Sequence, residues 1–82
     1  MSNVEYSYRP VAVLSEGVYL GTLMLHRDDY SRYDSIKDSE VVTAGQFLTS
    51  SQLDSLWISR HVRITLIPSE DRKVDILEWL MT

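Results

Sequence analysis

The sequence predicts a small α+β domain in the order β-β-(β)-α-β-α, in which an antiparallel sheet packs against two helices. Three observations predict this fold class. Residues 6–25 are rich in strand-forming side chains, a helix-capping pattern begins at Thr49, and strict apolar-polar alternation returns at residues 62–67. A chain of 82 residues is too short to divide into two hydrophobic cores, so we expect a single domain over residues 1–82.

The first predicted element is a β-hairpin formed by residues 6–14 and 18–25. The connection Ser15-Glu16-Gly17 ends in glycine, which accepts the positive φ angle that closes a hairpin. Pro10 has no amide hydrogen, which favours an edge or a bulge at that point of the first strand. The second strand is apolar on both faces, so it needs cover on two sides and is compatible with a homodimer.

We predict a long polar acidic loop at residues 26–40. This segment contains five carboxylates, three Lys or Arg side chains and almost no apolar residues. One interpretation is a solvated connection without a further role. The other is an acidic surface for a basic protein partner, since tyrosine is enriched at recognition surfaces. Its candidate partner-binding residues are Asp28, Asp29, Tyr30, Tyr33, Asp34 and Asp38.

We predict a short third strand at residues 40–44, which ends at Gly45. The next helix has a clear start, because Thr49 and Gln52 form a capping box and the helix then begins at Ser50. We expect it to end at residues 59–61. Helical spacing places three apolar residues on its inner face: Leu53, Leu56 and Trp57.

Residues 62–67 predict a strand with one apolar face, and Pro68 ends it. Ser69 then caps a second helix, whose acidic first turn complements the helix dipole. A strand at residues 73–80 is the alternative. Helix is favoured because three acidic residues recur at helical spacing: Asp71, Asp75 and Glu78.

The predicted last helix carries more apolar side chains than one stripe needs. Ile76 and Trp79 lie on its flank and are further candidate partner-binding residues, because exposed apolar patches mark interaction sites. In the alternative interpretation, these two side chains belong to the core.

The sequence contains no pattern that predicts a catalytic, cofactor-binding or metal site. His26 and His61 lack helix-spaced partner ligands, and there is no cysteine. Residues 28–33 depart from the calcium-loop pattern, and the three glycines do not have phosphate-loop spacing. We therefore expect a protein that is not an enzyme.

The lead functional hypothesis is a noncatalytic protein-protein interaction module, such as an inhibitor, adaptor or regulatory protein, in the manner of small acidic phage proteins that block host machinery. The alternatives are a DNA mimic or nucleic-acid-linked regulator and an accessory subunit of an enzyme. The net charge of −4 disfavours direct nucleic-acid binding. Without a signal peptide or a membrane-length apolar segment, the expected location is cytoplasmic, with no membrane contact.

Overall fold

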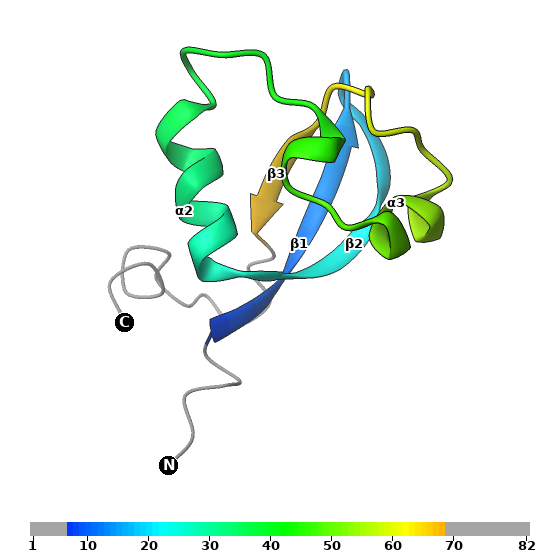
Figure 1. Cartoon of the computed structure of the whole chain (residues 1–82), viewed down its shortest axis with the longest axis horizontal. Coiled ribbons are helices and arrows are strands. Elements are labelled where there is room, and N and C mark those ends of the chain that lie inside the picture. Colours follow the sequence, from blue (N-terminus) through cyan, green and yellow to red (C-terminus); the bar gives the residue numbers. More distant parts are fainter. Residues whose placement is uncertain (1–6, 69–82) are drawn as a thin grey trace.

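The computed structural model describes residues 7–68 of the chain. The strands in this range form one antiparallel sheet in the order β2-β1-β3. Both helices and a short 3-10 helix pack on one side of this sheet (Figure 1). The elements in chain order are β1 (Tyr8–Ser15), β2 (Val18–His26), α2 (Arg27–Ile36), η1 (Ala44–Gln46), α3 (Ser50–Leu56) and β3 (Thr65–Pro68). The predicted α+β class, with an antiparallel sheet and two helices, is confirmed.

The predicted hairpin is present as β1 and β2, which pair from Tyr8 opposite His26 to Ser15 opposite Val18. The connection is shorter than predicted, because Ser15 still belongs to the strand. Its two residues, Glu16 and Gly17, have φ angles of 50° and 82°. A two-residue hairpin turn with positive φ at both positions matches the twist of the flanking strands.

β1 is the central strand, and Pro10 lies in the part of it that β3 does not reach. β3 pairs only with residues 11–14 of β1, so Pro10 has a paired neighbour in β2 alone among the described strands. Pro10 stands opposite Met24 and has no N–H to donate. Leu66 stands opposite Val13 and points its N–H away from β1, so by alternation Pro10 and Met24 form a non-hydrogen-bonded pair and the Pro10 nitrogen faces the side that β3 does not reach. The proline therefore fits the central strand without removing a hydrogen bond from the described ladders.

The hydrophobic core lies between the sheet and the helices. Val11 and Val13 of the central strand are 1% and 0% exposed, and burial of each contributes roughly 1.5–3 kcal/mol. Leu25 and Leu66 bring the two outer strands into the same layer. The remaining core residues come from the helical side of the molecule: Tyr30, Tyr33, Val42, Ala44, Phe47, Leu48 and Ile64.

The predicted loop at residues 26–40 is wrong, because residues 27–36 form helix α2. Tyr30 and Tyr33 lie one turn apart and bury their rings against the sheet, while the remaining side chains of the helix are polar or partly exposed. His26 caps the start, since its Nδ1 accepts a hydrogen bond from the Asp28 N–H at 3.0 Å. Asp28 and Asp29 in the first turn are favourable near the positive end of the helix dipole. Two tyrosines at helical spacing therefore supply enough apolar area to dock a polar helix.

The predicted strand at residues 40–44 is also replaced. In the described structure, this segment forms a single antiparallel β-bridge between Thr43 and Arg63, and the 3-10 helix η1 begins at Ala44. The Gln46 side chain accepts from the Thr43 N–H at 2.9 Å and fixes the start of η1. Ala44 is fully buried, so the start of η1 forms part of the hydrophobic core.

α3 begins at Ser50, as predicted, and its capping box is present. Thr49 Oγ1 accepts from the Gln52 N–H at 3.2 Å, and Gln52 Oε1 accepts from the Thr49 N–H at 2.9 Å. The helix ends at Leu56, earlier than the predicted residues 59–61, because Trp57 adopts a left-handed conformation with φ 59°. The predicted inner position of Trp57 is therefore wrong, since the following turn leaves this residue 93% exposed.

β3 covers the second half of the strand predicted at residues 62–67 and includes Pro68. Ile64 and Leu66 are buried and Thr65 is exposed, which is the predicted alternation. The helix predicted from Ser69 onward lies outside the described residues, and so do Ile76 and Trp79.

The contact between Gly21 and α3 generates a stability prediction. A Cβ atom at position 21 would stand 2.5 Å from Leu56 Cδ2, so Gly21→Ala has to displace the side chain that α3 packs on β2. We expect this substitution to lower the free energy of unfolding by about 1–3 kcal/mol in urea denaturation. Thr22→Ser at the neighbouring exposed position is the control and stays within about 0.5 kcal/mol. Equal stability of Gly21→Ala and the unsubstituted protein contradicts this packing.

Candidate functional site

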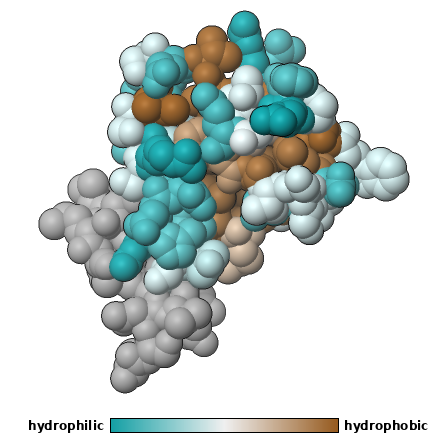
Figure 2. All heavy atoms as spheres, in the orientation of Figure 1, coloured by the Kyte–Doolittle hydropathy of each residue, from teal (hydrophilic) through white to brown (hydrophobic). Residues whose placement is uncertain are grey.

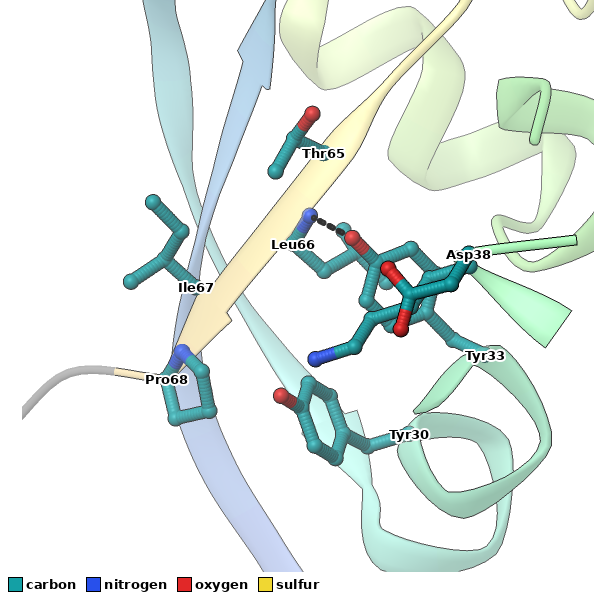
Figure 3. A pocket seen from close by; sticks show the side chains of 8 residues that line it. Tyr30, Tyr33, Asp38, Thr65, Leu66, Ile67 and Pro68 are labelled. Atoms are coloured by element: carbon teal, nitrogen blue, oxygen red, sulfur yellow. Dashed lines mark hydrogen bonds between the residues drawn. The ribbon is translucent and has the colours of Figure 1, made fainter. Parts of the chain in front are cut away.

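A hollow of about 470 Å³ lies between α2 and β3 and is the first candidate for a binding site. Tyr30 and Tyr33 project into it from α2, and Leu66 lies across from them on β3 (Figure 3). Tyr30 and Tyr33 are three residues apart, so a helix places both side chains on the same side, and this side of α2 faces the sheet. The lining residues are Tyr30, Tyr33, Lys37, Asp38, Thr65, Leu66, Ile67 and Pro68.

Tyr33 connects α2 to the edge of the sheet. Its hydroxyl oxygen accepts a hydrogen bond from the Leu66 N–H at 3.1 Å (Figure 3). Its ring meets Phe47 edge-on with the centroids 5.8 Å apart, and it lies 5.6 Å from the Tyr30 ring. β3 is an edge strand of the described sheet, and edge amides without partners invite pairing with other chains. Tyr33 satisfies one such amide from within the molecule.

Two titratable side chains of the hollow, Tyr30 and Lys37, have raised pKa values. Burial raises the pKa of the Tyr30 phenol, and the negative charge of Asp34 raises it further, whereas Lys37 opposes the shift. A hydrogen bond to Asp34 raises the pKa of Lys37, whose Nζ lies 3.0 Å from Oδ1 of that residue. The phenol therefore stays protonated and the ammonium stays charged at pH 7. Neither group is therefore poised to act as a base at neutral pH.

The acidic residues predicted to bind a partner lie along the solvent side of α2 and just beyond its end. Figure 2 shows hydrophilic side chains over α2 and hydrophobic ones between α2 and α3. Two of the carboxylates are paired locally: Asp29 lies 3.2 Å from Arg32, and Asp34 is paired with Lys37. The Asp28 side chain is 84% exposed, and Asp38 is exposed as well. The surface is therefore mixed in charge; among the described residues, Asp28 has the His26 imidazole beside it, with 3.6 Å between Oδ2 and Nδ1, and Asp38 forms no ion pair.

Tyr30 and Tyr33 do not belong to this exposed surface. They are 5% and 4% exposed and pack in the core, so the predicted acidic surface contains no tyrosine contacts. The sequence signal for their burial is the spacing of three residues between the two tyrosines, which places both on one side of a helix. The structure thus separates the predicted set into exposed acids and buried aromatic rings.

Arg32 joins α2 to η1 across the helical layer. Its guanidinium carbon stands 4.5 Å from the centroid of the Phe47 ring, and Nη1 donates to the Gln46 carbonyl at 3.3 Å. A planar guanidinium suits this combination of stacking and hydrogen bonding. The positive charge in the middle of the acidic segment is therefore committed to packing the helix.

Trp57 is a candidate contact residue that the sequence pattern misassigned to the core. It follows α3 in a Schellman motif, in which the Trp57 N–H donates to the Asp54 carbonyl and the Ile58 N–H to the Leu53 carbonyl, each at 3.2 Å. Glycine is the usual residue at this left-handed position. Without a glycine, the sequence offered no sign that the helix stops before Trp57.

The described residues contain no group of three or more His, Cys, Asp or Glu side chains that could hold a metal ion. His26 is used as the cap of α2. None of the helices within residues 7–68 has the length and apolar character required to cross a bilayer. No protein-family model, curated protein or solved structure matches the chain.

The raised pKa of Tyr30 generates a pH prediction. Its pKa in the folded state lies above the unfolded value of about 10, so the neutral phenol stabilises the fold below that pH, and this contribution is lost as pH rises through the folded pKa. Lys37 has the same sign and loses its contribution in the same alkaline range. We expect the free energy of unfolding to fall less steeply with pH above 10 in Tyr30→Phe than in the unsubstituted protein. Denaturant titrations at a series of alkaline pH values measure this slope, and an unchanged slope contradicts the burial of the phenol.

Proposed function

We propose that the protein is a noncatalytic protein-protein interaction module of the cytoplasm, of the inhibitor, adaptor or regulatory type, with Trp57 as its central contact. The observation that carries the proposal is the 93% exposure of this side chain together with its left-handed backbone. Tryptophan buries 150–250 Å² when it is covered and dominates many interface energies, as a general property of this side chain.

Stability of the fold does not account for a tryptophan at this position. A left-handed conformation costs a residue with a Cβ atom roughly 1 kcal/mol relative to glycine. An exposed indole also gains no burial energy within the described structure. A residue that is unfavourable on both counts, and that belongs to the type most enriched at interface hot spots, supports a role in contact with a partner.

The acidic side of α2 provides a second part of the proposed function. Asp28 and Asp38 face solvent, and such charges increase the association rate with a basic partner more than the final affinity. Arg32 and Lys37 interrupt this surface and pair with its other carboxylates. The mixed charge favours a protein partner over imitation of the regular charge array of DNA.

The proposal predicts that Trp57→Ala reduces capture of the partner. Tagged full-length chain is incubated with an extract of the source organism, and captured proteins are compared by quantitative mass spectrometry. We expect the principal partner to fall about tenfold or more with Trp57→Ala, because hot-spot truncations cost about 2 kcal/mol. Val41→Ala removes another exposed apolar side chain, 56% exposed, and serves as the matched control that retains capture.

Equal capture by Trp57→Ala and the unsubstituted chain contradicts the role of Trp57. A variant with Asp28, Asp29, Asp34 and Asp38 changed to Asn tests the acidic surface separately. We expect it to retain the same partner with weaker and less salt-dependent binding. Circular dichroism of each variant shows whether the fold is kept.

A further inference from the structure

The two edge strands of the described sheet, β3 and β2, differ in how well they are protected against pairing with another chain. β3 has four residues, its Leu66 N–H is bonded to the Tyr33 hydroxyl, and Pro68 has no N–H to donate. Short length, proline and covering side chains are common ways in which proteins protect an edge strand. β2 has nine residues and contains no proline and no Lys, Arg, Asp or Glu. The less protected edge of the described sheet is therefore β2.

The register of the sheet shows which backbone groups of β2 face outward. Leu66 points its N–H away from β1, and the alternation of antiparallel ladders then makes Thr22 and Met24 non-hydrogen-bonded partners of β1. Both residues therefore direct their N–H and C=O groups away from β1. The side chain of Gln52 in α3 donates to the Met24 carbonyl at 3.4 Å, which agrees with this direction. The other three groups form no hydrogen bond within residues 7–68.

The part of β2 that is suited to pairing is short. The register with β1 shifts at Leu20, and a bulge of this kind twists an edge away from further pairing. At its other end β2 finishes at His26, which caps α2. The regular part is residues 21–25, which we call the open edge. Its two outward residues, Thr22 and Met24, are about 6.8 Å apart along the strand, the spacing at which an antiparallel partner strand exchanges a pair of hydrogen bonds with each.

Helix α3 lies against the open edge and offers apolar contacts to an added strand (Figure 1). The Leu56 side chain contacts the backbone at Gly21 and is half-buried. Trp57 is the next residue and is 93% exposed. On the opposite side of the sheet, Met24 is 55% exposed. An added strand therefore has exposed apolar groups of this chain near both of its faces.

We propose that the open edge binds an extended, uncharged segment of the partner protein by β-strand addition. This inference rests on the proposed function, in which Trp57 contacts a protein partner, and it specifies how that partner is recognised. N–H and C=O groups that recur at every second residue of an extended strand are matched by the backbone of another extended polypeptide. Because β2 carries no charged side chain, a charge opposite it would gain no ion pair across the strands. We expect β-branched or aromatic residues at alternate positions of the partner segment.

Thr22→Pro distinguishes strand addition from folding. The Thr22 N–H takes no part in the ladder with β1, so proline removes the outward donor and leaves that ladder complete, as in natural edge strands. Thr22→Ala is the matched control, because it keeps the N–H while both variants lose the hydroxyl that is hydrogen-bonded to Tyr19. Circular dichroism of both variants shows whether the fold is kept.

The probe is a library of random dodecapeptides displayed on phage and selected on the immobilised full-length chain. We expect Thr22→Pro to weaken the binding of the selected peptides tenfold or more in fluorescence anisotropy titrations, and Thr22→Ala to change it less than twofold. Hydrogen exchange gives a second readout that needs no variant. In the free chain, we expect the Thr22 and Met24 amides to exchange faster than those of Leu23 and Leu25, which point toward β1. A saturating selected peptide slows the Thr22 and Met24 amides at least tenfold.

Selected peptides that bind Thr22→Pro as tightly as the unsubstituted chain overturn strand addition. A selection that yields no peptide able to slow exchange at Thr22 and Met24 overturns it as well, and this result decides alone if Thr22→Pro does not fold. Exchange that slows with chain concentration in the absence of peptide shows that a second copy occupies the open edge, and this also contradicts the proposal.

Failure of strand addition and failure of the proposed function give different results. If Trp57→Ala loses the partner while peptide binding ignores Thr22→Pro, the role of Trp57 stands and strand addition is wrong. If Trp57→Ala captures the partner fully while the peptides depend on the Thr22 N–H, the open edge binds extended segments and the role of Trp57 is wrong.

Discussion

The hydrogen bond between the Tyr33 hydroxyl and the Leu66 amide is the constraint on which the position of the helical layer depends. It joins the middle of α2 to β3, which are separated by thirty-three positions along the chain. The donor is buried, so loss of its partner would cost about 1–3 kcal/mol. Because the Tyr33 ring also packs on Phe47, one side chain fixes the helix against the sheet edge and against the segment that leads to α3.

This arrangement places all described helices on one side of three strands and divides the molecule into surfaces of different chemistry. The solvent side of α2 is charged, since its tyrosines point inward and its acids point outward. The side of the sheet opposite the helices exposes large apolar and aromatic side chains, among them Tyr19, Met24 and Ile67. Trp57 extends from the end of α3, beyond either surface. The described surface thus contains regions of different chemistry, while Tyr30 and Lys37 beside the hollow have raised pKa values.

The hairpin, the start of α3 and the alternation at residues 64–66 were predictable because local patterns determine them: glycine at a positive φ, a capping box, and polar residues between apolar ones. α2 was missed because it carries few apolar residues and because His26 caps it, whereas Ser, Thr, Asp and Asn are the usual cap residues. Its helical character depends on tertiary burial of Tyr30 and Tyr33. The same burial removes both tyrosines from the predicted acidic surface. The exposure of Trp57 was not predictable, because its left-handed turn occurs without the glycine that signals such a stop.

Hydrogen exchange at the Leu66 amide measures the central constraint most directly. In the described sheet this amide points away from β1, so Tyr33 is its acceptor, and exchange requires the helix to separate from the strand. We expect the Leu66 amide to exchange as slowly as the core amides of β1, and we expect Tyr33→Phe to accelerate its exchange at least tenfold more than that of those β1 amides. Rapid exchange of Leu66 in the unsubstituted protein, at the rate of an exposed edge-strand amide, would contradict the role of the Tyr33 hydrogen bond.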